Sequence, residues 1–307
     1  MNQRKKNMKF LKTNILITLF VILLYGTLHA EGNEEIWIKN LDEAIAKAKE
    51  VNKYLLVNFS GSDWCGWCMK FDEHIASKKE FQKAATKDFV LCVIDWRRKS
   101  PMPKEEEKHV VATKEKYGIQ GFPTILIMDK TGFPLFQLQT SYQDGIDGVL
   151  KKMKEGLDQA KNIEENLKII DSTENKDAHI QASKIILENM GSYAFFYTKY
   201  LDTMLTLDKD NKEGLAEKVY IRKIESLRTV ERKNLKKSID LAKKIIALPN
   251  VSDETQKIAY LYLAVMLKQD DKKEEAIKAA ENVKGLQIFR GRPFHYDKFM
   301  SYINTDN

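Results

Sequence analysis

The chain has 307 residues, with 51 lysines and arginines against 44 aspartates and glutamates, which gives a formal net charge of +7. Five of these bases lie within the first twelve residues, and without them the balance is 46 against 44. The rest of the chain therefore lacks the basic composition of proteins that bind nucleic acid or anionic surfaces. Its length leaves room for about two domains.

Residues 1–30 have the pattern of an export signal. A basic head ends at Lys12, an apolar run covers Ile15 to Tyr25, and Leu28-His29-Ala30 then offers a signal-peptidase site. The apolar run is shorter than the roughly 20 residues that span a bilayer. We therefore expect a cleaved signal peptide and a periplasmic or secreted protein. An uncleaved N-terminal membrane anchor is the alternative.

Two cysteines lie three residues apart in the motif Trp64-Cys65-Gly66-Trp67-Cys68. The apolar run Tyr54–Phe59 before the motif predicts a strand, and the residues after it have helical spacing. Cys65 should therefore lie at a helix N-terminus, where unpaired N–H groups and the helix dipole stabilise a thiolate. Cys68 should lie one turn further in, close enough to form a disulfide with Cys65.

A C-x-x-C pair is also half of a zinc site. The sequence offers no second half, because the remaining cysteine, Cys92, lies in a continuous apolar run that predicts a buried and inert thiol. Of the histidines, His74 is near the motif but falls on the following helix. We therefore expect no metal site, and a metal carrier that uses the two thiols is a minor alternative.

A second motif, Gly121-Phe122-Pro123-Thr124, leads directly into the apolar run Ile125–Met128. Proline is unusual at the start of a buried strand because it cannot donate to the ladder, and a cis Phe122–Pro123 bond would explain it. The two motifs in this order resemble the thioredoxin-like superfamily, in which a cis-proline loop faces the C-x-x-C. The turn Gly-Ser-Asp-Trp-Cys-Gly-Trp-Cys looks most like that of exported bacterial members. The resemblance covers about residues 34–155.

The remaining patterns of residues 31–155 agree with a thioredoxin-like α/β fold, a mixed central sheet flanked by helices. We expect a helix capped by Asn40 and a second one that starts at a capping box of Ser77 and Glu80. The other expected elements are a short strand at 36–38, strands at 54–59 and 89–95, a helix at 104–117, a hairpin of 125–128 with 133–138, and a helix from about 144.

From about residue 156 the apolar residues recur at helical spacing, and no proline occurs between Pro134 and Pro249. Residues 156–307 are therefore predicted to be an α-helical domain of helix hairpins, which resembles a tetratricopeptide-like array. This domain carries no evident chemistry. A concave helical surface would suit a protein partner.

The resemblance implies a thiol–disulfide oxidoreductase that acts on protein thiols or disulfides and has no cofactor beyond the redox-active disulfide Cys65–Cys68. Cys65 would attack and Cys68 would resolve the mixed disulfide. The redox partner is unknown. The implied substrate-binding residues are Trp64, Trp67, Phe122 and Pro123.

Aromatic residues beside the motif have alternative roles in packing. We expect Trp64 to pack under the turn and Trp67 to be partly exposed. Trp96 and the basic run Arg97–Lys99 are predicted to be a strand end and a solvated loop, not a binding site.

Two departures from thioredoxin leave the direction of the reaction open. Trp67 replaces the proline between the cysteines, and Asn58 occupies the strand position of a buried aspartate. An asparagine cannot take a proton there, so a water, Asp63 or Glu73 would have to substitute. The main alternative to an oxidoreductase is a partner-binding helical-repeat protein with a vestigial redox module.

Overall fold

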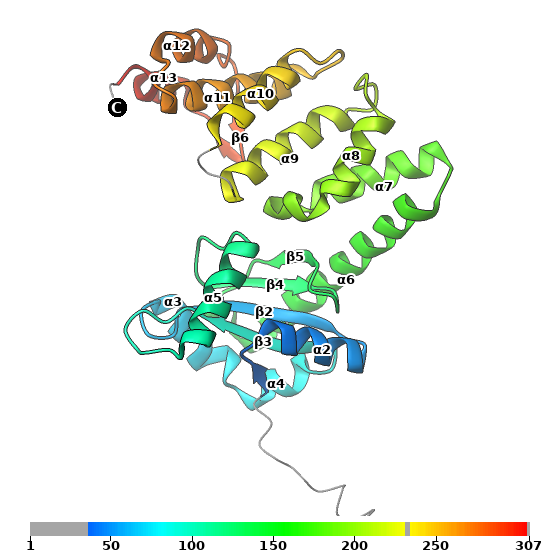
Figure 1. The fold of residues 1–307 in the computed structure, drawn as a ribbon, viewed down its shortest axis with the longest axis vertical. Coiled ribbons are helices and arrows are strands. Elements are labelled where there is room, and N and C mark those ends of the chain that lie inside the picture. Colours follow the sequence, from blue (N-terminus) through cyan, green and yellow to red (C-terminus); the bar gives the residue numbers. More distant parts are fainter. Residues whose placement is uncertain (1–35, 231–233, 306–307) are drawn as a thin grey trace, which may run out of the picture. The chain divides into compact units, whose positions relative to one another are not determined.

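The computed structural model describes residues 36–230 and 234–305. The expected signal peptide lies outside these residues. The central sheet has five strands in the order β1-β3-β2-β4-β5, in which β1 and β2 pair with β3 in parallel, while β4 is antiparallel to β2 and β5 to β4 (Figure 1). The strands are β1 Trp37–Ile38, β2 Tyr54–Ser60, β3 Phe89–Asp95, β4 Thr124–Met128 and β5 Pro134–Leu138. The predicted mixed sheet is confirmed.

Helices cover both faces of this sheet. Along the strand order, the connection from β1 to β2 moves in one direction and the connection from β2 to β3 moves back in the other. Because both are right-handed crossovers, their helices lie on opposite faces of the sheet. The first crossover contains α2, and the second contains α3, a π-helical segment η1, and α4. The bounds are α2 Leu41–Val51, α3 Gly66–Phe71, η1 Asp72–Ala76, α4 Lys79–Ala85 and α5 Lys104–Lys116.

The predicted helix caps are partly confirmed. Asn40 caps α2, since its side chain accepts hydrogen bonds from the backbone of Asp42 and Glu43. The capping box of Ser77 and Glu80 is wrong: the N-cap of α4 is Lys78, and the Ser77 hydroxyl donates instead to the carbonyl of Asp72 at 2.7 Å. The π-helical segment shifts the register of the chain before α4, and Ser77 closes that segment.

One hydrophobic core runs from the sheet into the helical region. After the short 3₁₀ turn η2, Tyr142–Asp144, the helix α6 begins at Gly145 and continues to Ser172, through the expected domain boundary at 155/156. Gly156 lets α6 approach the sheet, because a Cβ there would lie 2.9 Å from Ile127 and 3.0 Å from Phe136. The same core continues through α7 Lys176–Asn189, η3 Gly191–Tyr197, α8 Thr198–Leu207 and the start of α9 Leu215–Val230.

The 3₁₀ segment η3 carries the aromatic residues that join these helices to the sheet. The ring of Phe196 stacks on that of Tyr117 at 5.1 Å, and Tyr197 packs against Phe133 at 4.8 Å. The buried Tyr197 hydroxyl donates to the carbonyl of Pro134 at 3.0 Å. The aromatic residues of this 3₁₀ segment therefore belong to the core.

The last part of the chain has a second core, built mainly from α9 and the helices after it. Consecutive helices contact one another, and the Ser252 side chain caps α11. The helices are α10 Leu235–Ile246, α11 Asp253–Gln269, α12 Lys273–Glu281 and α13 Tyr296–Asn304. A two-stranded hairpin of β6 Ile288–Phe289 and β7 Arg292–Pro293 interrupts them, so the region is mostly helical but not all-α. Within the described residues, no helix has the length and apolarity to cross a membrane.

Candidate redox site

Cys65 and Cys68 form a disulfide, with their Cα atoms 5.2 Å apart. Cys65 is the N-cap of α3, and its sulfur accepts a hydrogen bond from the backbone N–H of Cys68 at 3.2 Å. Both side chains are buried, Cys65 with 7% and Cys68 with 3% of its surface exposed. The predicted placement at a helix N-terminus is therefore confirmed, and Cys65 is the more exposed of the two.

The turn before Cys65 is fixed at both ends. The backbone N–H of Cys65 donates to the carbonyl of Gly61 at 2.8 Å. At the end of β3, the Asp95 carboxylate accepts hydrogen bonds from the backbone and the hydroxyl of Ser62, at 2.8 and 2.6 Å. These contacts hold the cysteine pair at the carboxyl edge of β2 and β3.

Trp64 packs into an aromatic cluster beside the disulfide, as predicted. Its indole N–H donates to the carbonyl of Trp96 at 2.7 Å, and its ring lies 5.9 Å from that of Trp96 and 5.3 Å from that of Phe122. The Arg98 guanidinium lies 3.7 Å from the centre of the Trp64 ring and 4.3 Å from that of Trp96. Trp96 directly follows β3, and Arg98, Lys99 and Ser100 are exposed, as predicted for a strand end and a solvated loop; Trp96 and Arg98 also contact Trp64.

Asp63 holds the basic loop in place. Its carboxylate accepts hydrogen bonds from the backbone N–H groups of Arg98, Lys99 and Ser100, at 3.0, 2.8 and 2.7 Å. Although desolvation acts in the opposite direction, these hydrogen bonds keep the pKa of Asp63 well below its usual range. Asp63 is therefore ionised at neutral pH and cannot take over the proton transfer of a buried aspartate.

Trp67 lies on the other side of the pair and is 54% exposed, as predicted. Its ring lies 5.5 Å from that of Tyr142, which also contacts His74 at 5.8 Å and the ammonium of Lys70 at 5.2 Å. Trp67 thus presents most of an apolar surface to solvent next to the disulfide.

The Phe122–Pro123 bond is cis, as predicted. Thr124, the next residue, pairs with Phe59 at the end of β2 that leads into the cysteine turn. Phe122 itself contacts both Trp64 and Trp96. The structure thus brings Trp64 together with Phe122, the residue before the cis Pro123, whereas Trp67 contacts Tyr142.

Asn58 is buried in β2, between Val93 of β3 and Ile125 of β4. Its side-chain oxygen has no hydrogen-bond partner among the described residues. Glu73, the other acid proposed as a substitute, is exposed and lies 3.9 Å from His74. The sequence reasoning missed Asp72, which follows Cys68 by one helical turn and whose pKa is raised, first by burial and then by the charge of Asp95.

Cys92 is fully buried in β3, and burial, with a smaller effect of Glu43, raises the pKa of its thiol far above the usual range. The prediction of an inert thiol is consistent with this environment. Among residues 36–230 and 234–305, no three His, Cys, Asp or Glu side chains lie close enough together to hold a metal ion.

A pocket of about 750 Å³ opens beside the aromatic cluster. Side chains that line it include Trp64, Trp96, Arg98, Lys114 and Phe122. Lys114 comes from α5, and its ammonium lies 4.4 Å from the centre of the Trp96 ring. The pocket thus adjoins Cys65 through Trp64 and Pro123 through Phe122.

Two curated proteins of Chlamydia pneumoniae are similar to part of the chain. The thioredoxin-related protein DsbJ is 32% identical over 131 residues, which are 41% of this chain and 37% of DsbJ. The disulfide bond reductase DsbH is 30% identical over 96 residues, which are 31% of this chain and 58% of DsbH. The chain therefore spans less than two thirds of either relative.

Two solved structures also match. A DsbH oxidoreductase is 26% identical, with a TM-score of 0.33, over 38% of this chain and 85% of the other. A disulphide isomerase from Xylella fastidiosa Temecula1 is 16% identical, with a TM-score of 0.28, over 42% and 92%. Residues 41–154 match the family described as a thioredoxin-like domain. Together with the strand order, the cysteine pair and the cis-proline, this match identifies residues 41–154 as a thioredoxin-like domain related to DsbH and DsbJ.

Proposed function

We propose that this protein is a thiol–disulfide oxidoreductase that acts on protein clients, with Cys65 as the attacking thiol and Cys68 as the resolving one. The observation that carries the proposal is the Cys65–Cys68 disulfide at the N-terminus of α3, whose neighbour Trp64 packs against Phe122, the residue before the cis Pro123. Cys65 is the more exposed sulfur, and it accepts the Cys68 N–H bond that favours a thiolate.

In the reductive direction the reaction has two exchange steps. The Cys65 thiolate attacks one sulfur of the client disulfide, forms a mixed disulfide and releases the first client thiolate. The Cys68 thiolate then attacks the Cys65 sulfur, forms the Cys65–Cys68 disulfide and releases the second client thiolate. Two electrons pass from the protein to the client. The oxidative direction is the reverse of these steps, with a client dithiol as the electron donor.

The reductive direction is favoured because DsbH is a disulfide bond reductase. The test is a single turnover of the pre-reduced protein with a disulfide-bonded protein client, with the reduction potential of the cysteine pair measured in glutathione buffers. We expect stoichiometric reduction of the client and a potential near that of thioredoxin, about −270 mV. A potential as oxidising as about −120 mV would favour the oxidative direction instead. A pair that exchanges with no client would contradict the oxidoreductase proposal and favour a vestigial module.

We also propose that the protein works outside the cytoplasm after cleavage following Ala30. The basic head and short apolar run of residues 1–30 support this location. N-terminal sequencing of protein from the native host should find Glu31 as the first residue. An intact N-terminus in a membrane fraction would favour an anchor, and an intact N-terminus in the cytosol would contradict export.

The helical region is the proposed site for a protein partner. The consecutive helix pairs of α9 to α12, with a core of their own, support a tetratricopeptide-like array. A chain in which Cys65 and Cys68 are both serine should retain this partner in a co-purification from the native host. Loss of the partner with the cysteines would assign that interaction to the redox site.

A further inference from the structure

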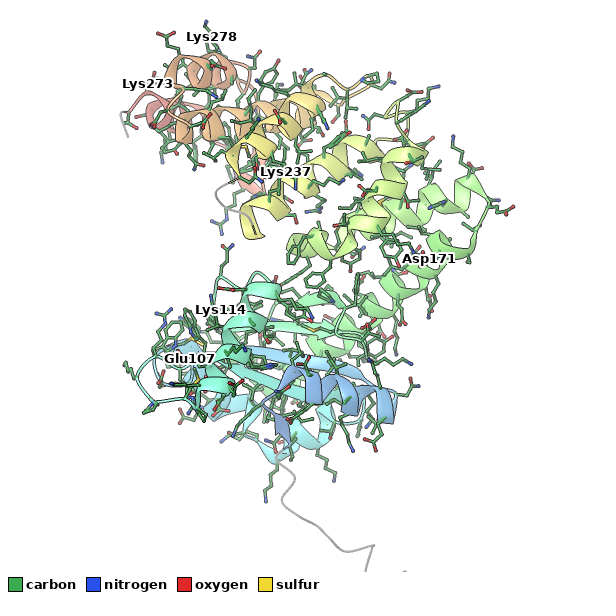
Figure 2. All side chains as sticks on the ribbon, viewed as in Figure 1. Glu107, Lys114, Asp171, Lys237, Lys273 and Lys278 are labelled. Atoms are coloured by element: carbon green, nitrogen blue, oxygen red, sulfur yellow. A yellow bond between two sulfur atoms is a disulfide. The ribbon has the colours of Figure 1, made fainter. Side chains whose placement is uncertain are left out.

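The pocket beside Trp64 contains two cationic side chains without an anionic partner. Neither Arg98 nor Lys114 makes an ion pair with any other residue that the structure describes, whereas the neighbouring Arg97 is paired with Glu106 at 2.7 Å. Both cations lie against indole rings instead: Arg98 against Trp64 and Trp96, and Lys114 against Trp96. Figure 2 shows Lys114 on α5, the helix that supplies this wall of the pocket.

The loop that carries Arg98 is held rigidly. The Asp63 carboxylate fixes three consecutive backbone N–H groups, starting at Arg98, so the guanidinium is kept over the Trp64 ring. Both carboxylate oxygens of Asp63 accept hydrogen bonds from this backbone. A guanidinium that lies against aromatic rings keeps in-plane N–H donors for a planar anion. The remaining acid at the pocket is Glu115, which leaves two cations against one carboxylate.

The location of the pocket relates it to the reaction. Trp64 precedes Cys65, and Phe122 precedes the cis Pro123, so the pocket borders both elements of the redox site. A client held in an extended conformation presents residues i and i+2 on the same side, about 6.6 Å apart. A residue close to the client cysteine can therefore enter the pocket while its sulfur meets Cys65.

We propose that this pocket binds a carboxylate side chain located two residues from the reacting cysteine of a polypeptide client. Arg98 and Lys114 supply the charge, and Trp64, Trp96 and Phe122 exclude water from one side. This inference rests on the proposed oxidoreductase function and adds to it a class of client: segments with an aspartate or glutamate two residues from the cysteine.

The test is the rate at which the pre-reduced full-length protein reduces disulfide-bonded peptides. The peptides are identical except that glutamate, glutamine or lysine occupies each of the two positions on either side of the cysteine. At low salt we expect the glutamate peptide to react about three to ten times faster than the glutamine peptide at one or more positions, and the lysine peptide to react more slowly. The preference should shrink as salt rises to about 0.5 M.

Variants localise the effect to the pocket. Arg98→Gln and Lys114→Gln should each lower the ratio of glutamate to glutamine rates, and the double Arg98→Glu, Lys114→Glu variant should favour the lysine peptide. Glu115→Gln should raise the ratio, because it removes the acid of the pocket. Lys108→Gln, which removes an exposed charge from the same helix outside the pocket, should leave it unchanged.

The outcomes separate this inference from the proposed function. Equal rates for the three peptides at every position would overturn the carboxylate proposal while leaving the oxidoreductase intact, and so would a preference that Lys108→Gln reduces as much as Arg98→Gln. Failure to reduce any peptide or protein disulfide would overturn the proposed function itself. The protein could instead reduce cystine faster than cystine diamide and show no preference among the peptides. That result would assign the pocket to small disulfides and overturn the polypeptide proposal.

Discussion

Replacing Gly61 with alanine tests whether the packing of Trp64 holds the cysteine turn. A Cβ at position 61 would lie 2.5 Å from Cε2 and 2.6 Å from Nε1 of the Trp64 indole. The ring has little room to retreat, because the rings of Trp96 and Phe122 lie beside it and Arg98 lies over it. To reach ordinary contact, the ring and the new methyl group must separate by about 1 Å.

The cost follows from these contacts. Overpacking of this kind destabilises a protein by about 1–3 kcal/mol. Displacement of the indole also lengthens the hydrogen bond from Trp64 to the Trp96 carbonyl, which contributes about 1 kcal/mol. We expect a loss of about 2–4 kcal/mol in the free energy of unfolding and a melting temperature roughly 5–10 °C lower.

Circular dichroism melting and tryptophan fluorescence measure the two consequences. Gly66→Ala is the matched control, because a Cβ there meets no atom within 4 Å and the residue opens α3, where alanine is the better helix former. The control should melt at or slightly above the wild-type temperature with unchanged emission. If Gly61→Ala has the melting temperature and emission of the wild type, the Trp64 packing does not hold the turn.

Three further changes probe other parts of the chain. Cys68→Ala should trap clients as mixed disulfides and leave Cys65 reactive toward iodoacetamide near neutral pH, whereas Cys65→Ala should trap no clients. If Cys68 is alkylated faster than Cys65, the assignment of attacking and resolving thiols is reversed. Tyr197→Phe removes the buried hydroxyl that donates to Pro134 and should cost about 1–2 kcal/mol in urea unfolding. This is more than the cost of the control Tyr200→Phe, since Tyr200 is half-buried and its hydroxyl makes a solvent-exposed hydrogen bond to Asp171; equal losses would contradict this reasoning. Hydrogen bonds from Lys152, Ser141 and Thr140 lower the pKa of Asp144 from 3.8 to about 2, so its contribution to stability is fully present above pH 3.8 and is lost as the pH falls toward 2. Asp144→Asn should therefore cost about 1 kcal/mol at pH 6 and almost nothing at pH 2, as measured by unfolding at both pH values; a constant difference would show that ionisation is not involved.

The sequence predicts the elements of the sheet well because their signals are local. The strand Phe89–Asp95 has the predicted bounds, and Gly118, with φ of +60°, follows α5 in the left-handed conformation that glycine favours. The capping box at Ser77 is wrong for a different reason. The sequence pattern does not reveal the π-helical segment Asp72–Ala76 before it, and this segment moves the start of α4 so that Lys78, not Ser77, is the N-cap.

The pocket residues could not be predicted in the same way. Trp64 and Trp96 are 32 residues apart in the sequence. Arg98 lies in the loop after β3, whereas Lys114 lies in α5. Their contacts depend on how the strands pair, and the local composition of a basic loop does not indicate which base lies against a ring. A charged run after a strand therefore predicts a solvated loop from the sequence, and only the structure shows that Arg98 of this loop lies against the Trp64 ring.

The apolar periodicity of the sequence also does not show where the thioredoxin-like domain ends. The apolar stripe of α6 continues without a break from Val149 to Ile170, and its buried face serves the sheet first and the next helices afterwards. The stripes predicted for the later helices coincide with α7 to α12, because each is amphipathic. Periodicity shows where a helix buries a face, but not which partner covers it.

If Cys68 is the resolving thiol, as we propose, its proton needs an acceptor other than a buried aspartate. Asn58 occupies that strand position, and its buried side-chain oxygen finds no partner among the described residues, so the strand interior offers a dipole but no titratable group. Asp63 is locked in its ionised form by three backbone N–H groups. Asp72 has the opposite character, since burial and Asp95 raise its pKa, and it follows Cys68 by one turn. Of Asp63 and Asp72, only Asp72 therefore has an environment that favours the protonated form.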